Sequence, residues 1–430
     1  MSREMRHSGI EWIGDIPKEW EVNIIGNLYQ VRNEKVSDKD YPPLSVTMGG
    51  IVPQLETAAK TNNGDDRKLV CKGDFAINSR SDRRGSCGVS QYDGSVSLIN
   101  TILKPRSSMN SQFYNWLFHT ELFADEFYKW GHGIVDDLWT TRWQEMKNIS
   151  IVYPSLSEQQ RIANHLDKIC GDIDDMVALQ EQMIEELKAY KQSVITEAVT
   201  RGLNPKTQMR QSGIDWIGYI PKHWEVIRFY KSNWIRARLG WKGLKAEEYT
   251  ETGYPFLSAF NIVNDKLVWN DLNFINQERY DESPEIKLSI GDLLLVKDGA
   301  GIGKCALVDS LPKGEATVNS SLAVVTPTNN RILPNYQYYY FKSSVFQNTI
   351  WLLKIGMGVP HLTQENMKDI ILPCPPVEEQ NTIVSYLDKK CSEIDSLIAI
   401  KQAKIEELKE YKKSIIYEYV TGKKEVPYGD

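Results

Sequence analysis

The chain has 430 residues, of which 41% are hydrophobic and 25% are charged, a composition typical of folded globular proteins. This length predicts two or three domains, because single hydrophobic cores rarely grow beyond roughly 250–300 residues. No apolar run approaches the roughly 20 residues that cross a bilayer, and the N-terminus lacks the apolar core of a secretion signal. We therefore expect no contact with a membrane.

The six cysteines are scattered without a C-x-x-C pair, and the six histidines lack the spacing of metal ligands. This pattern argues against a structural zinc site and a disulfide framework, and it favours free thiols in a reducing cytoplasm. The net charge of −6 neither suggests nor excludes a nucleic-acid partner, because a near-neutral domain can gather its basic residues on one face.

The strongest signal is an internal repeat. Residues 8–22 read SGIEWIGDIPKEWEV and residues 212–226 read SGIDWIGYIPKHWEV, so that twelve of fifteen positions are identical. A second repeat relates PSLSEQQRIANHLDK (154–168) to PPVEEQNTIVSYLDK (375–389). The segments between these blocks, which we call the first insert (23–152) and the second insert (227–373), share little. A duplicated framework with two divergent inserts is typical of two related domains held at a fixed separation.

The first insert has a mixed α and β pattern. KGDFAINS (72–79) predicts a strand entered through a Gly-Asp turn, and the aromatic segment 110–130 predicts a helix pair with its rings in the core. The strand is followed by NSRSDRRGS, a run whose Arg residues are suited to binding phosphates or guanine edges. A solvated basic loop is the alternative. The candidates for nucleic-acid contact in this insert are Lys60, Lys68, Arg80, Arg83 and Arg84.

Residues 153–203 predict a helix of about 40 residues, or roughly 60 Å. Ser157 and Gln160 fit a capping box at its start, Gly202 fits a stop at its end, and apolar residues recur at three- to four-residue spacing between them. Residues 374–425 repeat this pattern. Two such helices predict a coiled coil. We favour an antiparallel pair, with the inserts at opposite ends, over a parallel pair, with the inserts side by side.

Each helix has one polar interruption of its apolar seam near the middle, Gln180 in the first helix and Lys401 at the matching position of the second. We hypothesise that these side chains meet and fix the register of the pair, as single polar seam residues often do. The alternative is that both are simply exposed.

The second insert repeats the mixed pattern, with a strand predicted at IGDLLLV (290–296) and aromatic helices at 334–353. Basic residues gather in WIRARLGWKGLK, which we interpret as a loop, and in KDGAGIGKC. The candidates for nucleic-acid contact are Arg236, Arg238, Trp241, Lys242, Lys245, Lys297 and Lys304. KDGAGIGKC (297–305) fails as a phosphate-binding loop, because Asp298 replaces a required glycine and Cys305 replaces the magnesium-binding Ser or Thr.

Catalytic motifs are missing. An amino-methyltransferase must bind an extruded base, for which it uses an Asn- or Asp-Pro-Pro-aromatic motif. This motif is absent, because the only Pro-Pro pairs lie in YPPL and CPPV. PEIK (284–287) with Asp281 resembles a metal-dependent nuclease motif only through a short match that is common by chance. We expect no catalytic residue and no metal site.

Together, the paired GIEWIGDIPKEWEV and GIDWIGYIPKHWEV boxes, the P-x-x-x-E-Q-x-x-I helix starts and the long Ile/Leu helices resemble the specificity subunits of type I restriction–modification systems. The resemblance covers nearly the whole chain. It implies an α+β fold of two pseudo-symmetric repeats, each a mixed α/β target recognition domain followed by a long helix, with the two helices in an antiparallel coiled coil. The implied boundaries are 1–152, 153–203, 204–373 and 374–425.

The resemblance further implies that each recognition domain reads one half of a bipartite site in double-stranded DNA, and that the helices set the gap between the halves. The implied partners are two modification subunits, which use S-adenosylmethionine, and restriction subunits, which use ATP and magnesium. This chain itself would bind no cofactor. Two alternatives remain open, namely an enzyme and a coiled-coil adaptor that binds only proteins. A methylation assay and a salt-dependent DNA-binding assay distinguish them.

Overall fold

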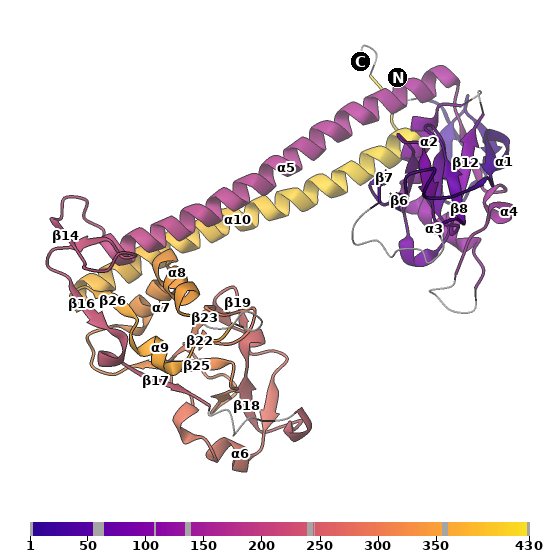
Figure 1. The fold of residues 1–430 in the computed structure, drawn as a ribbon. Helices are drawn as coiled ribbons and strands as arrows, with labels where there is room; N and C mark the ends of the chain where they lie inside the picture. The colour runs from indigo at the N-terminus through magenta and orange to yellow at the C-terminus, as the bar shows by residue number, and fades with distance from the viewer. Residues whose placement is uncertain are drawn as a thin grey trace. The chain divides into compact units, whose positions relative to one another are not determined.

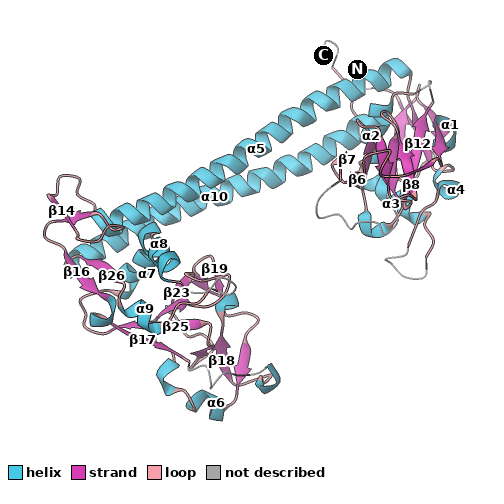
Figure 2. Cartoon of the chain, viewed as in Figure 1, coloured by secondary structure: helices cyan, strands magenta, loops and turns pink. Residues whose placement is uncertain are grey.

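The computed structural model describes residues 3–54, 64–106, 109–133, 139–238, 244, 246–354 and 360–427. The chain divides into two compact units, Met1–Glu181 with Gln402–Asp430, and Gln182–Lys401. Each unit combines one insert with a stretch of each of two long helices (Figures 1 and 2). The fold is α+β and consists of two repeats, each a mixed domain followed by a long helix, as the sequence predicts.

Before its long helix, the first unit is built from short strands and helices. The strands are β1 (Met5–His7), β2 (Asp15–Pro17), β3 (Glu21–Ile24), β4 (Tyr29–Arg32), β5 (Lys35–Val36), β6 (Leu44–Thr47), β7 (Gly50–Pro53), β8 (Arg67–Val70), β9 (Phe75–Asn78), β10 (Cys87–Val89), β11 (Gly94–Val96), β12 (Asn100–Pro105) and β13 (Ser150–Tyr153). The helices are α1 (Ile25–Leu28), α2 (Ser111–Phe118), α3 (Glu121–Lys129), α4 (Trp143–Met146) and the 3-10 turn η1 (Ser81–Arg83).

The second unit repeats this construction. Its strands are β14 (Met209–Gln211), β15 (Tyr219–Pro221), β16 (Glu225–Arg228), β17 (Asn233–Ala237), β18 (Tyr254–Leu257), β19 (Ile262–Val263), β20 (Lys266–Leu267), β21 (Asn273–Ile275), β22 (Leu293–Val296), β23 (Cys305–Leu307), β24 (Thr317–Val318), β25 (Leu322–Pro327) and β26 (Ile371–Cys374). Its helices are α6 (Gln277–Asp281), α7 (Pro334–Lys342), α8 (Ser344–Leu353), α9 (Gln364–Lys368) and the 3-10 turns η3 (Phe229–Lys231), η5 (Ala246–Glu248), η6 (Ala259–Asn261) and η7 (Pro284–Ile286).

The central sheets of the two inserts have the same strand order. In the first it is β10-β9-β12-β4, and in the second β23-β22-β25-β17, with all neighbours antiparallel. The predicted strands at 72–79 and 290–296 become β9 and β22, whose four residues are all buried in each case. The inserts differ in their three-stranded sheets, which are β11-β8-β5 in the first and β21-β18-β24 in the second.

The aromatic segments form the predicted helix pairs, α2–α3 and α7–α8, and most of their rings lie in the two main cores, although Trp351 is 66% exposed. In the first core, the Phe118 and Phe123 centroids are 4.4 Å apart, and in the second those of Phe341 and Phe346 are 4.3 Å apart. Such ring pairs add to the stabilisation from burial itself. These rings share each core with residues of the central sheet and of the long helices.

The long helices are α5 (Leu156–Arg201) and α10 (Val377–Val420). The predicted cap at Ser157 is wrong: the helix begins at Leu156, and the cap lies two residues earlier at Ser155, whose hydroxyl accepts the Glu158 amide at 3.3 Å. The predicted stops are confirmed, since Gly202 and Gly422 both have φ of +72°, a left-handed conformation that favours glycine. No helix in the described part of the chain is long and apolar enough to cross a bilayer.

Within each unit, a stretch of α5 lies antiparallel to a stretch of α10. In the first unit Lys412 pairs with Asp174 at 2.6 Å, and in the second Lys191 pairs with Asp395 at 2.7 Å. Asp174 and Asp395 hold the same position of the repeat, as do Lys191 and Lys412. The two ion pairs are therefore equivalent contacts with the helices exchanged, which is the pattern of an antiparallel, pseudo-symmetric coiled coil.

Candidate nucleic-acid interface

In the first unit, residues 79–86 form a loop that connects β9 to β10 at one end of the central sheet. The base of this loop is held in place because the Ser81 amide donates to the Trp139 carbonyl at 3.1 Å. The loop exposes three predicted contact residues, Arg80, Arg83 and Arg84. A basic loop on a rigid sheet is an arrangement suited to contacts with DNA phosphates and base edges.

An open groove of about 810 Å³ runs beside loop 79–86, between the start of α3 and the tip of the β6–β7 hairpin. On the groove wall, Arg84 forms an ion pair with Asp125, and Arg83 Nε lies 3.7 Å from the Asp82 carboxylate. The side chains of Arg83 and Arg84 are 70% and 50% exposed, so these ion pairs contribute at most about 1 kcal/mol each. Both arginines can therefore exchange their carboxylate partners for a phosphate or a base.

The second unit has an equivalent loop at residues 297–304, between β22 and β23. Both loops are held by an isolated antiparallel β-bridge. Arg80 pairs with Thr140 in the first unit, and Asp298 pairs with His361 in the second. Lys304 is exposed on this loop, as the prediction requires. Lys297 is only 8% exposed, and its Nζ lies 2.6 Å from the Asp298 carboxylate, so it positions the loop rather than facing outward.

Arg236 and Arg238 do not lie in a loop, contrary to the sequence interpretation. Residues 234–238 of that run form most of strand β17 and the residue after it, and the two side chains point inward because residues two apart share one face of a strand. Arg236 is 6% exposed and pairs with the fully buried Asp292 at 2.9 Å, while Arg238 is 4% exposed. Burial lowers the pKa of Arg236 and Asp292 opposes this shift. We therefore leave both arginines out of the interface.

The first insert has an equivalent ion pair, in which the aspartate is buried and the arginine is 20% exposed. Arg32 Nε donates to the Asp74 carboxylate at 2.7 Å, and Arg32 and Arg236 hold the same position after their respective boxes. The hydrogen bond with Asp74 raises the pKa of Arg32. The Gly-Asp turns were recognised in the sequence, but this ion pair was not, although the shared position of the two arginines was a signal that could have revealed it.

The remaining predicted residues fall into two groups. Lys68 is half-buried, its Nζ donates to the Asn100 carbonyl at 2.7 Å, and burial lowers its pKa, so it serves the fold of the insert. The predictions at Lys60, Trp241, Lys242 and Lys245 lie outside the described residues.

The hypothesis on helix register stays a prediction. Gln180 belongs to the first unit and Lys401 to the second. Within the second unit, Lys401 Nζ lies 3.2 Å from the Met183 sulfur on α5, so Lys401 faces the partner helix rather than turning away from it.

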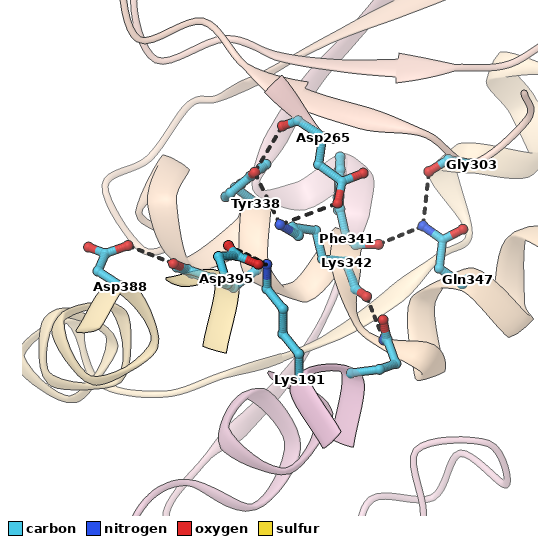
Figure 3. Close-up of polar contacts among 11 residues, drawn as sticks. Lys191, Asp265, Gly303, Tyr338, Phe341, Lys342, Gln347, Asp388 and Asp395 are labelled. Carbon is cyan, nitrogen blue, oxygen red and sulfur yellow. Dashed lines mark hydrogen bonds and ion pairs between the residues drawn. The ribbon is translucent and has the colours of Figure 1, made fainter. Parts of the chain in front are cut away.

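Both inserts are fixed to their helix pairs through one aspartate of the repeat. Asp388 on α10 accepts the Tyr339 hydroxyl at 2.6 Å, and Asp167 on α5 accepts the Trp116 indole at 2.8 Å. Within the second insert, the β19–β20 turn contacts α7, since the Asp265 carbonyl accepts the Tyr338 hydroxyl at 2.9 Å (Figure 3). Each insert is thus anchored on the helices while its loop lies at an end of the central sheet.

The cysteines of this chain are not activated as nucleophiles. Burial raises the pKa of all six cysteines, for example that of Cys170 to about 11, so their thiols stay protonated near neutral pH. Among the residues that the structure describes, no group of three or more His, Cys, Asp or Glu side chains is placed to hold a metal ion.

Comparison with known proteins gives one consistent family. Residues 240–410 match the family described as the type I restriction modification DNA specificity domain. The MjaVIII specificity subunit of a type I restriction enzyme from Methanocaldococcus jannaschii is 27% identical over 280 residues, which are 64% of this chain and 62% of that subunit. The EcoDI specificity subunit from Escherichia coli is 20% identical over 412 residues, 89% of this chain and 84% of that subunit.

Solved structures share the fold. A chain from a structure titled for complex assembly and conformational transition of the type I R-M system matches with a TM-score of 0.73 and 15% identity, covering 95% of this chain and 99% of that chain. The HsdS subunit from Thermoanaerobacter tengcongensis matches with a TM-score of 0.52 and 15% identity, covering 95% of this chain and 98% of that subunit. The duplicated boxes, the equivalent inserts and these relatives agree, and over nearly its whole length the chain is similar to the specificity subunits of type I restriction–modification systems.

Proposed function

We propose that this chain recognises a bipartite sequence in double-stranded DNA. The first recognition domain (1–152) reads one half of the site, and the second (204–373) reads the other. The helical segments 153–203 and 374–425 set the gap between the halves. The observation that carries the proposal is the equivalence of loops 79–86 and 297–304, which occupy the same place on the same sheet but have unlike sequences.

The exposed cations of the two loops make the proposed contacts. Arg80, Arg83 and Arg84 serve the first half-site, and Lys304 serves the second. Arginine can bind guanine in a bidentate manner in the major groove, and both residue types bind phosphates. Because the first loop is richer in arginine, its half-site should show the stronger salt dependence of binding.

We further propose that the chemistry is performed by partner subunits and that this chain has no catalytic residue. Two modification subunits, which carry S-adenosylmethionine, would dock on the helical segments and methylate adenine. Restriction subunits would bring ATP and magnesium and cut unmodified DNA. All six cysteines are free, which supports our proposal of a cytoplasmic location.

A selection experiment tests the proposal. The full chain is incubated with a library of random-sequence DNA duplexes, and the retained duplexes are sequenced. We expect two short conserved blocks separated by a gap of fixed length. A parallel map of methylated adenines, in a host with the modification subunit and with or without this chain, should show the same bipartite motif only when the chain is present. Enrichment of no motif, or of one continuous block, would contradict the proposal.

A further inference from the structure

Among the described residues, two large apolar side chains are more exposed than the others. Phe260 is 92% exposed and Met48 is 73% exposed. Sequence analysis missed both residues. Single exposed apolar side chains are common on protein surfaces, so it is the place of these two in the fold that is informative.

The two residues lie at the ends of equivalent segments, one position apart in the repeat. YPPLSVTM (41–48) and YPFLSAFN (254–261) share the pattern Tyr-Pro-x-Leu-Ser, a repeat inside the otherwise divergent inserts. Both segments also pair in parallel with equivalent neighbours, through the bridge from Pro43 to Ser95 and the register from Phe256 to Thr317. Met48 directly follows β6, and Phe260 lies in the η6 turn soon after β18. Each domain thus ends this strand with one projecting apolar side chain.

The backbone beneath each tip is held by hydrogen bonds. The Thr47 hydroxyl donates to the Gly50 carbonyl at 2.9 Å and accepts the Gly49 amide at 3.2 Å. In the second domain, the Asn261 side-chain oxygen accepts the Ser258 amide at 2.8 Å. The side chains are therefore presented on ordered turns, which lowers the entropy lost when a ligand covers them.

Both tips adjoin the proposed DNA-contacting loops. Met48 lines the same groove as Arg83 and Arg84. In the second domain, the 319–321 turn connects the segment before Phe260 to loop 297–304. The Asn319 amide donates to the Leu257 carbonyl, and the Ser321 carbonyl accepts the Lys297 amide at 2.9 Å. In the first domain the apolar tip and the cationic loop share one groove, and in the second these backbone hydrogen bonds connect the strand before the tip to the start of loop 297–304.

We propose that Met48 and Phe260 are base-contacting residues, each placed against the base stack of its own half-site while the adjoining loop holds the phosphates and base edges. This inference rests on the proposed DNA recognition and adds to it a specificity-determining residue in each domain. Phe and Met are among the side chains that proteins press between base steps, and apolar groups also discriminate thymine by its methyl group.

The test uses full-length chains with Phe260→Ser or Met48→Ser in the library selection. We expect each substitution to weaken the consensus of one half-site only, a different half for each residue, and to lower affinity for the wild-type consensus duplex by about tenfold. Phe260→Leu should retain most of the preference, because it keeps an apolar side chain. A 2-aminopurine reporter in the affected half-site should fluoresce more with wild-type chain than with the Ser variant, since contact with the stack disturbs it.

Matched controls are Tyr92→Ser and Ile290→Ser, which remove apolar side chains that are 45% and 69% exposed beyond the opposite ends of β9 and β22. These controls should leave the motif and the affinity unchanged. If wild-type chain selects a bipartite motif and the Phe260 and Met48 variants select the same motif with equal affinity, the inference is wrong while the proposed function stands. A variant that binds DNA normally but no longer retains the modification subunit would assign the tips to a protein partner and also overturn the inference. If wild-type chain selects no motif, the proposed function itself fails.

Discussion

In both inserts an arginine–aspartate pair lies in the central sheet, but the loops at the end of that sheet have different chemistry. Loop 79–86 exposes three arginines, whereas loop 297–304 contains Asp298, three glycines and the exposed Lys304. The repeat has thus kept the residues that fix the sheet and the helices, and it has changed those that face outward. A common scaffold with divergent loops is how one fold can recognise two different ligands.

The largest expected effect on stability comes from removing the arginine–aspartate ion pair that both inserts share. Arg236→Ala leaves Asp292 buried without its partner, and we expect the second unit to lose about 3–5 kcal/mol of stability. Arg32→Ala should cost less, because the Arg32 side chain is 20% exposed while that of Arg236 is 6% exposed. Urea dependence of hydrogen exchange at β22 and β9 measures both effects.

The control for this prediction is the double variant Arg236→Met/Asp292→Leu. It removes both charges and keeps apolar volume, so it should recover much of the lost stability. Equal stability of the wild-type and Arg236→Ala chains would show that the pair does not support the sheet.

The second prediction tests whether the helix seams are equivalent. Ile173 and Ile394 hold the same repeat position and are 1% and 2% exposed. Ile173→Ala and Ile394→Ala should each cost about 2–5 kcal/mol, by lost burial and the cavity that remains. The measurement is hydrogen exchange along α5 and α10. If the losses of unfolding free energy in the two variants differ by more than about twofold, the two halves of the helix seam are not equivalent.

The third prediction sharpens the difference between the loops. Arg83→Ala/Arg84→Ala should weaken binding to the selected duplex by about 1–3 kcal/mol and relax the base preference in one half-site only. DNA-binding titrations at several salt concentrations should also show that the affinity of this variant depends less on salt than that of wild type, because fewer phosphates are neutralised. Relaxation of both half-sites would contradict the assignment of one loop to one half.

The smallest effect concerns the ion pairs between the helices. Lys191→Ala and Lys412→Ala each remove one equivalent contact to an aspartate that is more than half exposed. We expect each to cost about 0.2–1 kcal/mol, with similar values for the two. Thermal unfolding at low and high salt is the measurement, and the difference from wild type should shrink at high salt.

Sequence patterns predicted the periodic elements well. The three- to four-residue spacing of apolar side chains gave both long helices and their glycine stops, and the buried strands after the Gly-Asp steps were also found. The site was harder to predict. The basic composition of the run suggested a loop at Arg236. The structure instead shows a strand paired with β25, in which the Arg236 side chain is buried against Asp292. The exposure of Phe260 likewise depends on tertiary contacts that a single sequence does not specify.

The account depends most on the helices as a rigid spacer between two readers, and a paired deletion tests this directly. Residues 175–181 of α5 and 404–410 of α10 lie together in the first unit, where Val177 packs against the core that includes Leu408. Removing both segments shortens each helix by about 10 Å while keeping the heptad phase. The library selection should then recover the same two half-sites at a changed gap, with at least tenfold weaker binding to the original duplex, on the order of 1.4 kcal/mol. Unchanged affinity at the original gap would contradict the account.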